Sequence, residues 1–177
     1  DRLYQWGAHE IQLGILKRLR GTPIIRHTEA FQMVYSDAPP YEIIANVDVS
    51  ESELDAFKHF AKYWDAIANS GRFTHTLPLI MSGVSPYARF ADLSQYLNSI
   101  WQRSHSIALE KLCTEVANWL MQHSMDHDEV REAVTADYLA SGAQGKLPWM
   151  TRGLTIDTKQ KTDGSLLARQ ARHQTAL

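Results

Sequence analysis

The fold is decided by residues 50–77, SESELDAFKHFAKYWDAIANSGRFTHTL. Ser50 and Glu53 have the spacing of a capping box, in which each side chain accepts a hydrogen bond from the backbone N–H of the other residue. The apolar residues that follow recur every three or four positions: Leu54, Phe57, Phe60, Ala61, Trp64, Ile67 and Ala68. This period predicts a helix with one buried face. Asn69 and Gly71 predict its end, because both residue types tolerate the left-handed backbone conformation that closes many helices.

Length and composition set the outer bounds. The 177 residues fit one domain, and a hydrophobic content of 44% is enough for a core. A net charge of -2 argues against a general nucleic-acid or membrane-surface binder. The single cysteine, Cys113, excludes an intramolecular disulfide and fits a reducing compartment, so we expect a cytoplasmic protein. No apolar run reaches the roughly 18 residues needed to span a bilayer.

The start of the chain is the least helical part. Residues 11–19 suit a strand by one spacing of their apolar residues and a helix by another, so periodicity does not decide between them. Pro23 and the pair Pro39 and Pro40 interrupt regular structure, with short extended pieces expected around and after them. Because the chain lacks an initiator Met and begins at Asp1, we expect a piece of a longer protein.

The rest of the chain reads as helices. Pro86 marks a helix start, and the apolar stripe that follows is Phe90, Leu93, Leu97, Ile100 and Trp101. Ser106 is expected to cap the next helix, and residues 126–141 predict another, with acidic residues near its start. Residues 151–177 are polar and aperiodic, which indicates a loosely ordered tail. The sequence therefore predicts a mainly α-helical bundle of four to five helices with a short extended or β-containing N-terminal segment.

Four motifs, in this order, carry a family resemblance: residues 12–17 (QLGILK) with GTP at 21–23, residues 35–41 with their two prolines, residues 69–73 (NSGRF), and residues 137–148, which begin DYL and end LP. The first resembles the segment that closes the catalytic barrel of cobalamin-binding radical SAM proteins. The others resemble the C-terminal domain that follows the barrel in one branch of that class. The resemblance spans roughly residues 8–150.

The resemblance implies a division into three parts. Residues 1–25 would be the remnant or edge of the barrel, 26–150 a helical C-terminal accessory domain, and 151–177 the tail. Radical SAM enzymes bind a [4Fe-4S] cluster through a CxxxCxxC loop and cleave S-adenosylmethionine, and many carry cobalamin. This chain has one Cys and lacks that motif, so we expect it to bind none of these cofactors. The full-length oxidoreductase or methyltransferase would use all three, and the implied partners are its barrel and cobalamin-binding domain.

The resembling motifs supply the candidate substrate-side or interdomain residues: Asn69, Ser70, Gly71, Arg72, Phe73, His75, Asp137 and Tyr138. None is expected to be catalytic by itself. Arg72 beside His75 can meet an anionic group, or it can cap the carbonyl groups of a nearby helix. Asp137 is either a paired structural residue at a helix junction or a polar group that faces a pocket.

Other candidates are weaker. His123 and His127 have the i,i+4 spacing of metal ligands, but residues 124–126 indicate a helix junction that would destroy this geometry. Trp64, Trp101, Trp119 and Cys113 lie on helical stripes and are expected in the core. The sequence contains no nucleophile elbow, no P-loop and no dinucleotide-binding glycine motif.

The rival interpretation is a stand-alone helical protein-interaction module without enzymatic activity. A detached enzyme domain should expose apolar surface around residues 8–45, where the barrel would lie. An interaction module should instead present a groove between intact helices. The ligand domain of a transcription regulator is a third interpretation, disfavoured because no basic recognition helix is visible.

Overall fold

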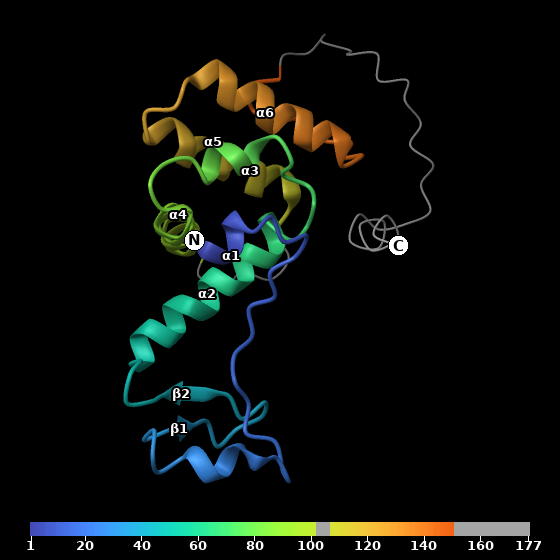
Figure 1. Cartoon of the computed structure of the whole chain (residues 1–177). Coiled ribbons are helices and arrows are strands. Elements are labelled where there is room, and N and C mark those ends of the chain that lie inside the picture. Colours follow the sequence, from blue (N-terminus) through green and yellow to red (C-terminus); the bar gives the residue numbers. More distant parts are fainter. Residues whose placement is uncertain (102–106, 151–177) are drawn as a thin grey trace, which may run out of the picture. The chain divides into compact units, whose positions relative to one another are not determined.

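The computed structural model describes residues 1–101 and 107–150, and these are mainly α-helical (Figure 1). The elements are, in chain order, α1 (Arg2–Gln5), the 3-10 helix η1 (Pro23–His27), β1 (Val34–Tyr35), β2 (Ile43–Ala45), α2 (Glu51–Ile67), α3 (Thr76–Ile80), α4 (Pro86–Ile100), α5 (Leu109–Gln122) and α6 (His127–Ala140). The predicted fold class is confirmed, with α2, α4, α5 and α6 as its long helices. The predicted tail at 151–177 and the predicted cap Ser106 lie outside the described residues.

The chain divides into two compact units. The first, here called the helical unit, comprises Asp1–Ile11 and the chain from Tyr63 onward. The second, the small unit, comprises Gln12–Lys62. This division by contacts does not test the domain boundaries that the resemblance implies, which stay predictions.

In the helical unit, α5 packs against both α4 and α6, and α3 packs against α4 and α6 (Figure 1). Its largest fully buried side chains include Trp119, Tyr63, Phe73 and Phe90. The Trp64 ring meets the Phe90 ring edge-on at 5.0 Å between centroids, a favoured geometry for aromatic pairs. Trp64 and Ile67 of the predicted α2 stripe, together with the predicted stripe of α5, therefore contribute to this core.

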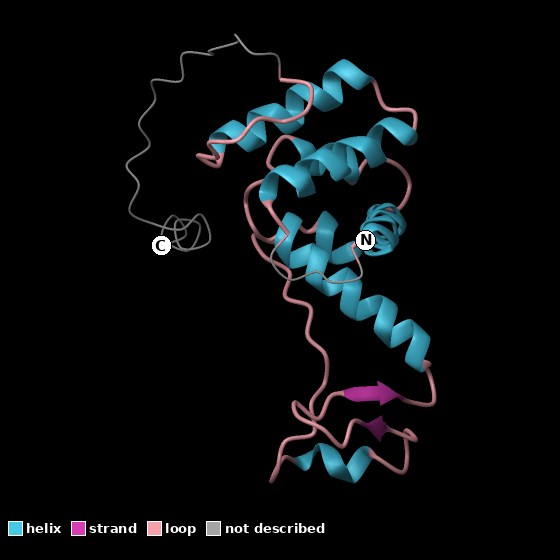
Figure 2. Cartoon of the chain, turned by 180° about the vertical axis from the view of Figure 1, so that it is seen from behind, coloured by secondary structure: helices cyan, strands magenta, loops and turns pink. Residues whose placement is uncertain are grey.

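The small unit is built on a two-stranded antiparallel sheet (Figure 2). Tyr35 of β1 lies opposite Ile43 of β2, and an isolated bridge joins Lys17 to Glu42. Residues 11–19, for which periodicity was ambiguous, contribute this bridge and no helix. Only three of the unit's residues are buried, namely Tyr35, Ile43 and Phe60, so its own core is very small.

The predicted capping box at the start of α2 is present. Glu53 Oε2 accepts from the Ser50 backbone N–H at 2.8 Å and from the Ser50 hydroxyl at 2.7 Å, and Ser50 Oγ accepts from the Glu53 N–H at 3.3 Å. The end of the helix is also as predicted, because α2 stops at Ile67 and Gly71 has a φ of 71°. Local sequence therefore determines both ends of this helix.

One core prediction is wrong. Trp101 is not buried, and Ile100 is 41% exposed. The reason is that α4 ends at Ile100, and Trp101 has an extended backbone (φ -118°, ψ 95°) that takes its side chain off the buried stripe of Phe90, Leu93 and Leu97. Among the described residues, no helix has both the length and the apolar character needed to cross a bilayer.

The capping box predicts a pH-dependent stability. Hydrogen bonds from the Ser50 side chain and backbone hold the pKa of Glu53 below its ordinary value. A carboxyl whose pKa is lowered by folding stabilises the protein above its unfolded-state pKa, and this contribution is lost as the pH falls through the folded-state pKa. We expect Glu53→Gln to lower the melting temperature at pH 7 and to leave it unchanged near pH 3, by circular dichroism.

The matched control is Glu51→Gln, which removes a carboxylate from the same first turn. Both variants lose the interaction of a charge with the helix dipole, so only the difference between them reports the capping box. An equal pH dependence for the two variants would show that the hydrogen bonds to Ser50 do not stabilise α2.

Candidate functional site

The predicted site residues on the 69–73 segment begin with a buried amide. The Asn69 side chain donates from Nδ2 to the Ile11 carbonyl at 3.1 Å and accepts from the Ile11 N–H at 3.3 Å. The Trp64 indole N–H donates to the same carbonyl at 3.0 Å. Asn69 and Trp64 therefore fix the chain at Ile11, which lies 58 residues away from Asn69 in the sequence.

The next residues shape the backbone. Ser70 Oγ donates to the Ile67 carbonyl at 3.0 Å and accepts from the Arg72 N–H at 3.2 Å, which satisfies groups at the end of α2. Gly71 adopts the left-handed conformation that a side chain disfavours. Phe73 is fully buried in the core. Like Asn69, the predicted site residues Ser70, Gly71 and Phe73 thus have structural roles, because they turn and anchor the segment.

Asp137 of α6 is the acceptor that holds the following residues. Its side chain is buried, with 1% of the residue exposed. Oδ1 accepts from the Thr74 hydroxyl at 3.0 Å and from the His75 N–H at 2.9 Å, and Oδ2 accepts from the Thr76 N–H at 2.8 Å. The carboxylate therefore caps the start of α3 from another helix. Sequence reasoning placed Asp137 at a junction but did not identify Thr74 and Thr76 as its partners.

Two further polar side chains are buried beside Asp137. Burial, followed by the charge of Asp137, raises the pKa of the Cys113 thiol to about 12. Burial, followed by the charge of Glu110, raises the pKa of Tyr138 above its ordinary value. Both groups are therefore neutral at physiological pH, and the prediction of Cys113 as a core residue is confirmed.

Arg72 and His75 are the predicted site residues whose side chains stay exposed. The hydrogen bonds described above fix the backbone on either side of them. A guanidinium and an imidazole on a fixed segment can bind a carboxylate or a phosphate group. This is the part of the candidate site that can interact with another molecule.

The predicted junction between α5 and α6 is present. His123 follows the last residue of α5, Ser124 has a φ of 60°, and Asp126 caps α6 by accepting from the N–H groups of Asp128 and Glu129. His123 and His127 therefore do not share one helix. The described residues hold no group of three or more His, Cys, Asp or Glu side chains arranged for a metal ion.

Instead, His123 belongs to a network that sequence reasoning missed. Its Nε2 lies 3.1 Å from Asp92 Oδ2, and the same carboxylate oxygen accepts from the Trp119 indole N–H at 2.8 Å. The Arg89 guanidinium lies 4.5 Å from the centroid of the Trp119 ring. This network joins α4 to α5. Asp92 is 27 or more residues away from Trp119 and His123 in the sequence, so no local pattern could have indicated this network.

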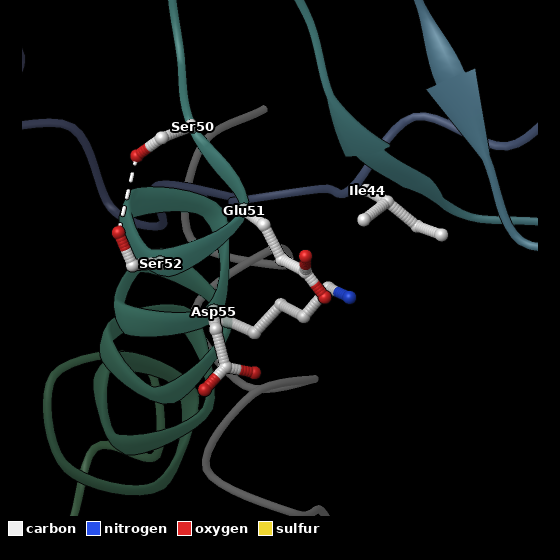
Figure 3. Close-up of a pocket in the computed structure, with 6 residues that line it drawn as sticks. Ile44, Ser50, Glu51, Ser52 and Asp55 are labelled. Carbon is white, nitrogen blue, oxygen red and sulfur yellow. Dashed lines mark hydrogen bonds between the residues drawn. The ribbon is translucent and has the colours of Figure 1, made fainter.

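A pocket of about 690 Å³ lies in the small unit at the start of α2 (Figure 3). Its lining residues are Ile44, Ser50, Glu51, Ser52, Asp55 and Lys58. The hydroxyls of Ser50 and Ser52 lie 3.2 Å apart and hydrogen bond to each other (Figure 3). Ser50 also forms the capping box of α2, and none of the predicted site residues lines the pocket.

The buried carboxylate of Asp137 predicts a large stability effect. We expect Asp137→Ala to lower the free energy of unfolding by about 2–4 kcal/mol, because it leaves buried donors without an acceptor. Urea denaturation followed by tryptophan fluorescence would measure the change. Asp128→Ala removes an exposed carboxylate from the first turn of the same helix, with its ion pair to Arg131, and should change the value by less than about 1 kcal/mol. A similar small loss for both variants would contradict the role given to Asp137.

Comparison with curated proteins found no match, and comparison with solved structures found none. The model of one family, described as "Protein of unknown function (DUF4080)", matches residues 29–177. This span covers α2 to α6 and the whole of the segment that carries Arg72 and His75. The chain therefore belongs to the DUF4080 family.

Proposed function

We propose that this chain is the C-terminal accessory domain of a cytoplasmic, cobalamin-type radical SAM enzyme, an Fe-S oxidoreductase or methyltransferase. In this role it packs on the barrel, shapes its substrate side and has no catalytic activity alone. The ordered motifs between residues 8 and 150 support the proposal, and the family match over residues 29–177 covers most of the same region. The family itself has no described function, so the enzyme class comes from the motifs.

The observation that carries the proposal is where apolar surface stays exposed. Twelve large apolar side chains are exposed among the described residues, and six of them lie between residues 8 and 45. They are Leu16, Leu19, Ile25, Phe31, Val34 and Tyr41. The number of exposed apolar side chains in this stretch of sequence supports the proposal that it meets another protein. It is the stretch expected to face the barrel, which favours the accessory domain over an interaction module.

The residues present do not fit an iron-sulfur cluster. Such a cluster needs several thiolate ligands, and the sequence holds one Cys. That residue, Cys113, is buried, and its raised pKa keeps the thiol protonated. In the proposed enzyme the cluster, S-adenosylmethionine and cobalamin would therefore be bound by other parts of the polypeptide. This chain would contribute positioning through Arg72 and His75.

The first test concerns cluster binding. The reading frame that contains residues 1–177 should encode a CxxxCxxC motif upstream of Asp1. After anaerobic reconstitution, the full polypeptide should bind one [4Fe-4S] cluster and cleave S-adenosylmethionine, and residues 1–177 alone should do neither. Iron, sulfide and visible absorption measurements give the result. Stoichiometric cluster binding by residues 1–177, or a reading frame without a cysteine-rich barrel, would overturn the proposal in favour of a self-sufficient interaction module.

The second test concerns Arg72. In the full-length enzyme, Arg72→Ala should lower turnover roughly tenfold or more, because a fixed guanidinium would no longer position its anionic partner. Cluster content should stay unchanged. Arg131→Ala is the control, since it removes an exposed guanidinium from α6 that pairs with the surface residue Asp128 at 3.7 Å. Equal turnover in Arg72→Ala and the parent enzyme would remove Arg72 from the site.

A further inference from the structure

Within the small unit, residues 16–27 form a basic and apolar segment, LKRLRGTPIIRH. It contains four Lys or Arg residues and no Asp or Glu. Leu16, Leu19 and Ile25 on this segment are exposed, Ile25 by 65%. An exposed stretch that combines aliphatic side chains with one sign of charge is unusual for a surface that faces only water. We call it the basic segment.

Two of its four cations contact residues of the small unit that lie outside the segment. Lys17 Nζ lies 4.0 Å from the Glu42 carboxylate, and the Arg18 guanidinium lies 5.0 Å from the centroid of the Tyr35 ring. These contacts hold the segment beside the sheet. Arg20 and Arg26 are exposed, and neither forms an ion pair with any residue in 1–101 or 107–150. Arg26 Nε donates to the neighbouring His27 ring at 3.1 Å. The segment therefore presents, among apolar side chains, two guanidinium groups that have no carboxylate partner in the described part of the chain.

The small unit also lacks a core that could explain its apolar content. Only three of its residues are buried, while Phe31 and Val34 join the aliphatic groups of the basic segment at the surface. A unit of this size with so small a core gains little stability from burial by itself. Covering the basic segment and its neighbours would supply the missing burial.

The charges of the basic segment indicate which kind of molecule could cover this segment. A second copy of the same surface would bring like charges together, which disfavours self-association. An interfacial helix, the commonest way in which a basic and apolar segment binds a membrane surface, is not formed here, because the only helix in this segment is the five-residue η1. A single-stranded nucleic acid is commonly bound by aromatic side chains among the cations, and the basic segment contains no Phe, Tyr or Trp. A protein face with an apolar centre and a rim of carboxylates fits best.

We propose that the basic segment is a docking surface for such a face, with Arg20 and Arg26 pairing with Asp or Glu side chains at its rim. This inference rests on the proposed function, because the face is assigned to the barrel of the same polypeptide. It adds the chemistry of that contact, namely acidic groups on the barrel and sensitivity of docking to salt.

The test measures hydrogen exchange of residues 16–34 by mass spectrometry in the full polypeptide and in residues 1–177 alone. We expect exchange in this region to be about tenfold slower in the full polypeptide at 50 mM NaCl, and this protection to fall at 500 mM NaCl. The double variant Arg20→Glu and Arg26→Glu should lose the protection. The control, Lys111→Glu with Lys146→Glu, reverses two exposed charges in the helical unit and should keep it.

A second double variant, Leu19→Ser with Ile25→Ser, tests the apolar centre and should also lose the protection. Both positions are exposed, so the fold of residues 1–177 should be unchanged, which circular dichroism verifies. Phosphatidylserine–phosphatidylcholine vesicles and a 20-nucleotide single-stranded RNA, each added to residues 1–177, should not protect residues 16–34. Protection by either one would overturn the assignment of a protein partner.

The outcomes separate the two proposals. A reading frame without the cysteine motif overturns both. A full polypeptide that binds its cluster but leaves residues 16–34 unprotected overturns the docking inference alone. Full protection retained in the Arg20 and Arg26 variant, at both salt concentrations, would likewise contradict a docking surface that depends on charge.

Discussion

The helical unit depends on one buried carboxylate. Asp137 lies on the buried face of α6, where an unpaired charge would be strongly destabilising. Three donors from residues 74–76 compensate it, two of them backbone N–H groups that precede or begin α3. The interaction joins segments more than 60 residues apart and fixes the course of the chain between α2 and α3. The positions of Thr74, His75 and Thr76 in the candidate site follow from this fixed course.

Because the backbone is fixed on both sides of Arg72, the loop between α2 and α3 holds the base of the Arg72 side chain in a defined position. Asn69 holds one end through Ile11, and Asp137 holds the other through His75 and Thr76. A site whose supporting residues are locked by hydrogen bonds keeps its geometry more closely than one on a free loop. The buried side chains of Asn69 and Asp137 thus position the backbone, whereas the side chains of Arg72 and His75, which can bind a ligand, stay at the surface.

Local patterns predicted the helices well and the site only in part. The capping box of Ser50 and Glu53 was readable because its residues are three positions apart, and the apolar period of α5 was readable for the same reason. Trp101 was misplaced because periodicity does not show where a helix ends. The partners of Asp137 and of Asp92 were not predictable, since those contacts join different helices or loops and exist only after packing.

Two independent features are the basis of our proposal that this chain acts with a partner. One is chemical: a lone thiol, buried and protonated, cannot supply the ligands of a cluster. The other is physical: the helical unit has a well-filled core, while the small unit buries three side chains and exposes many apolar ones. Any protein poor in cysteine would lack the ligands of a cluster, so that feature by itself is weak support. A small core by itself would indicate only that the small unit gains little stability from burial. The exposed apolar side chains share their segment with Arg20 and Arg26, which lack a carboxylate partner among the described residues, and this combination is the basis of the proposed contact surface.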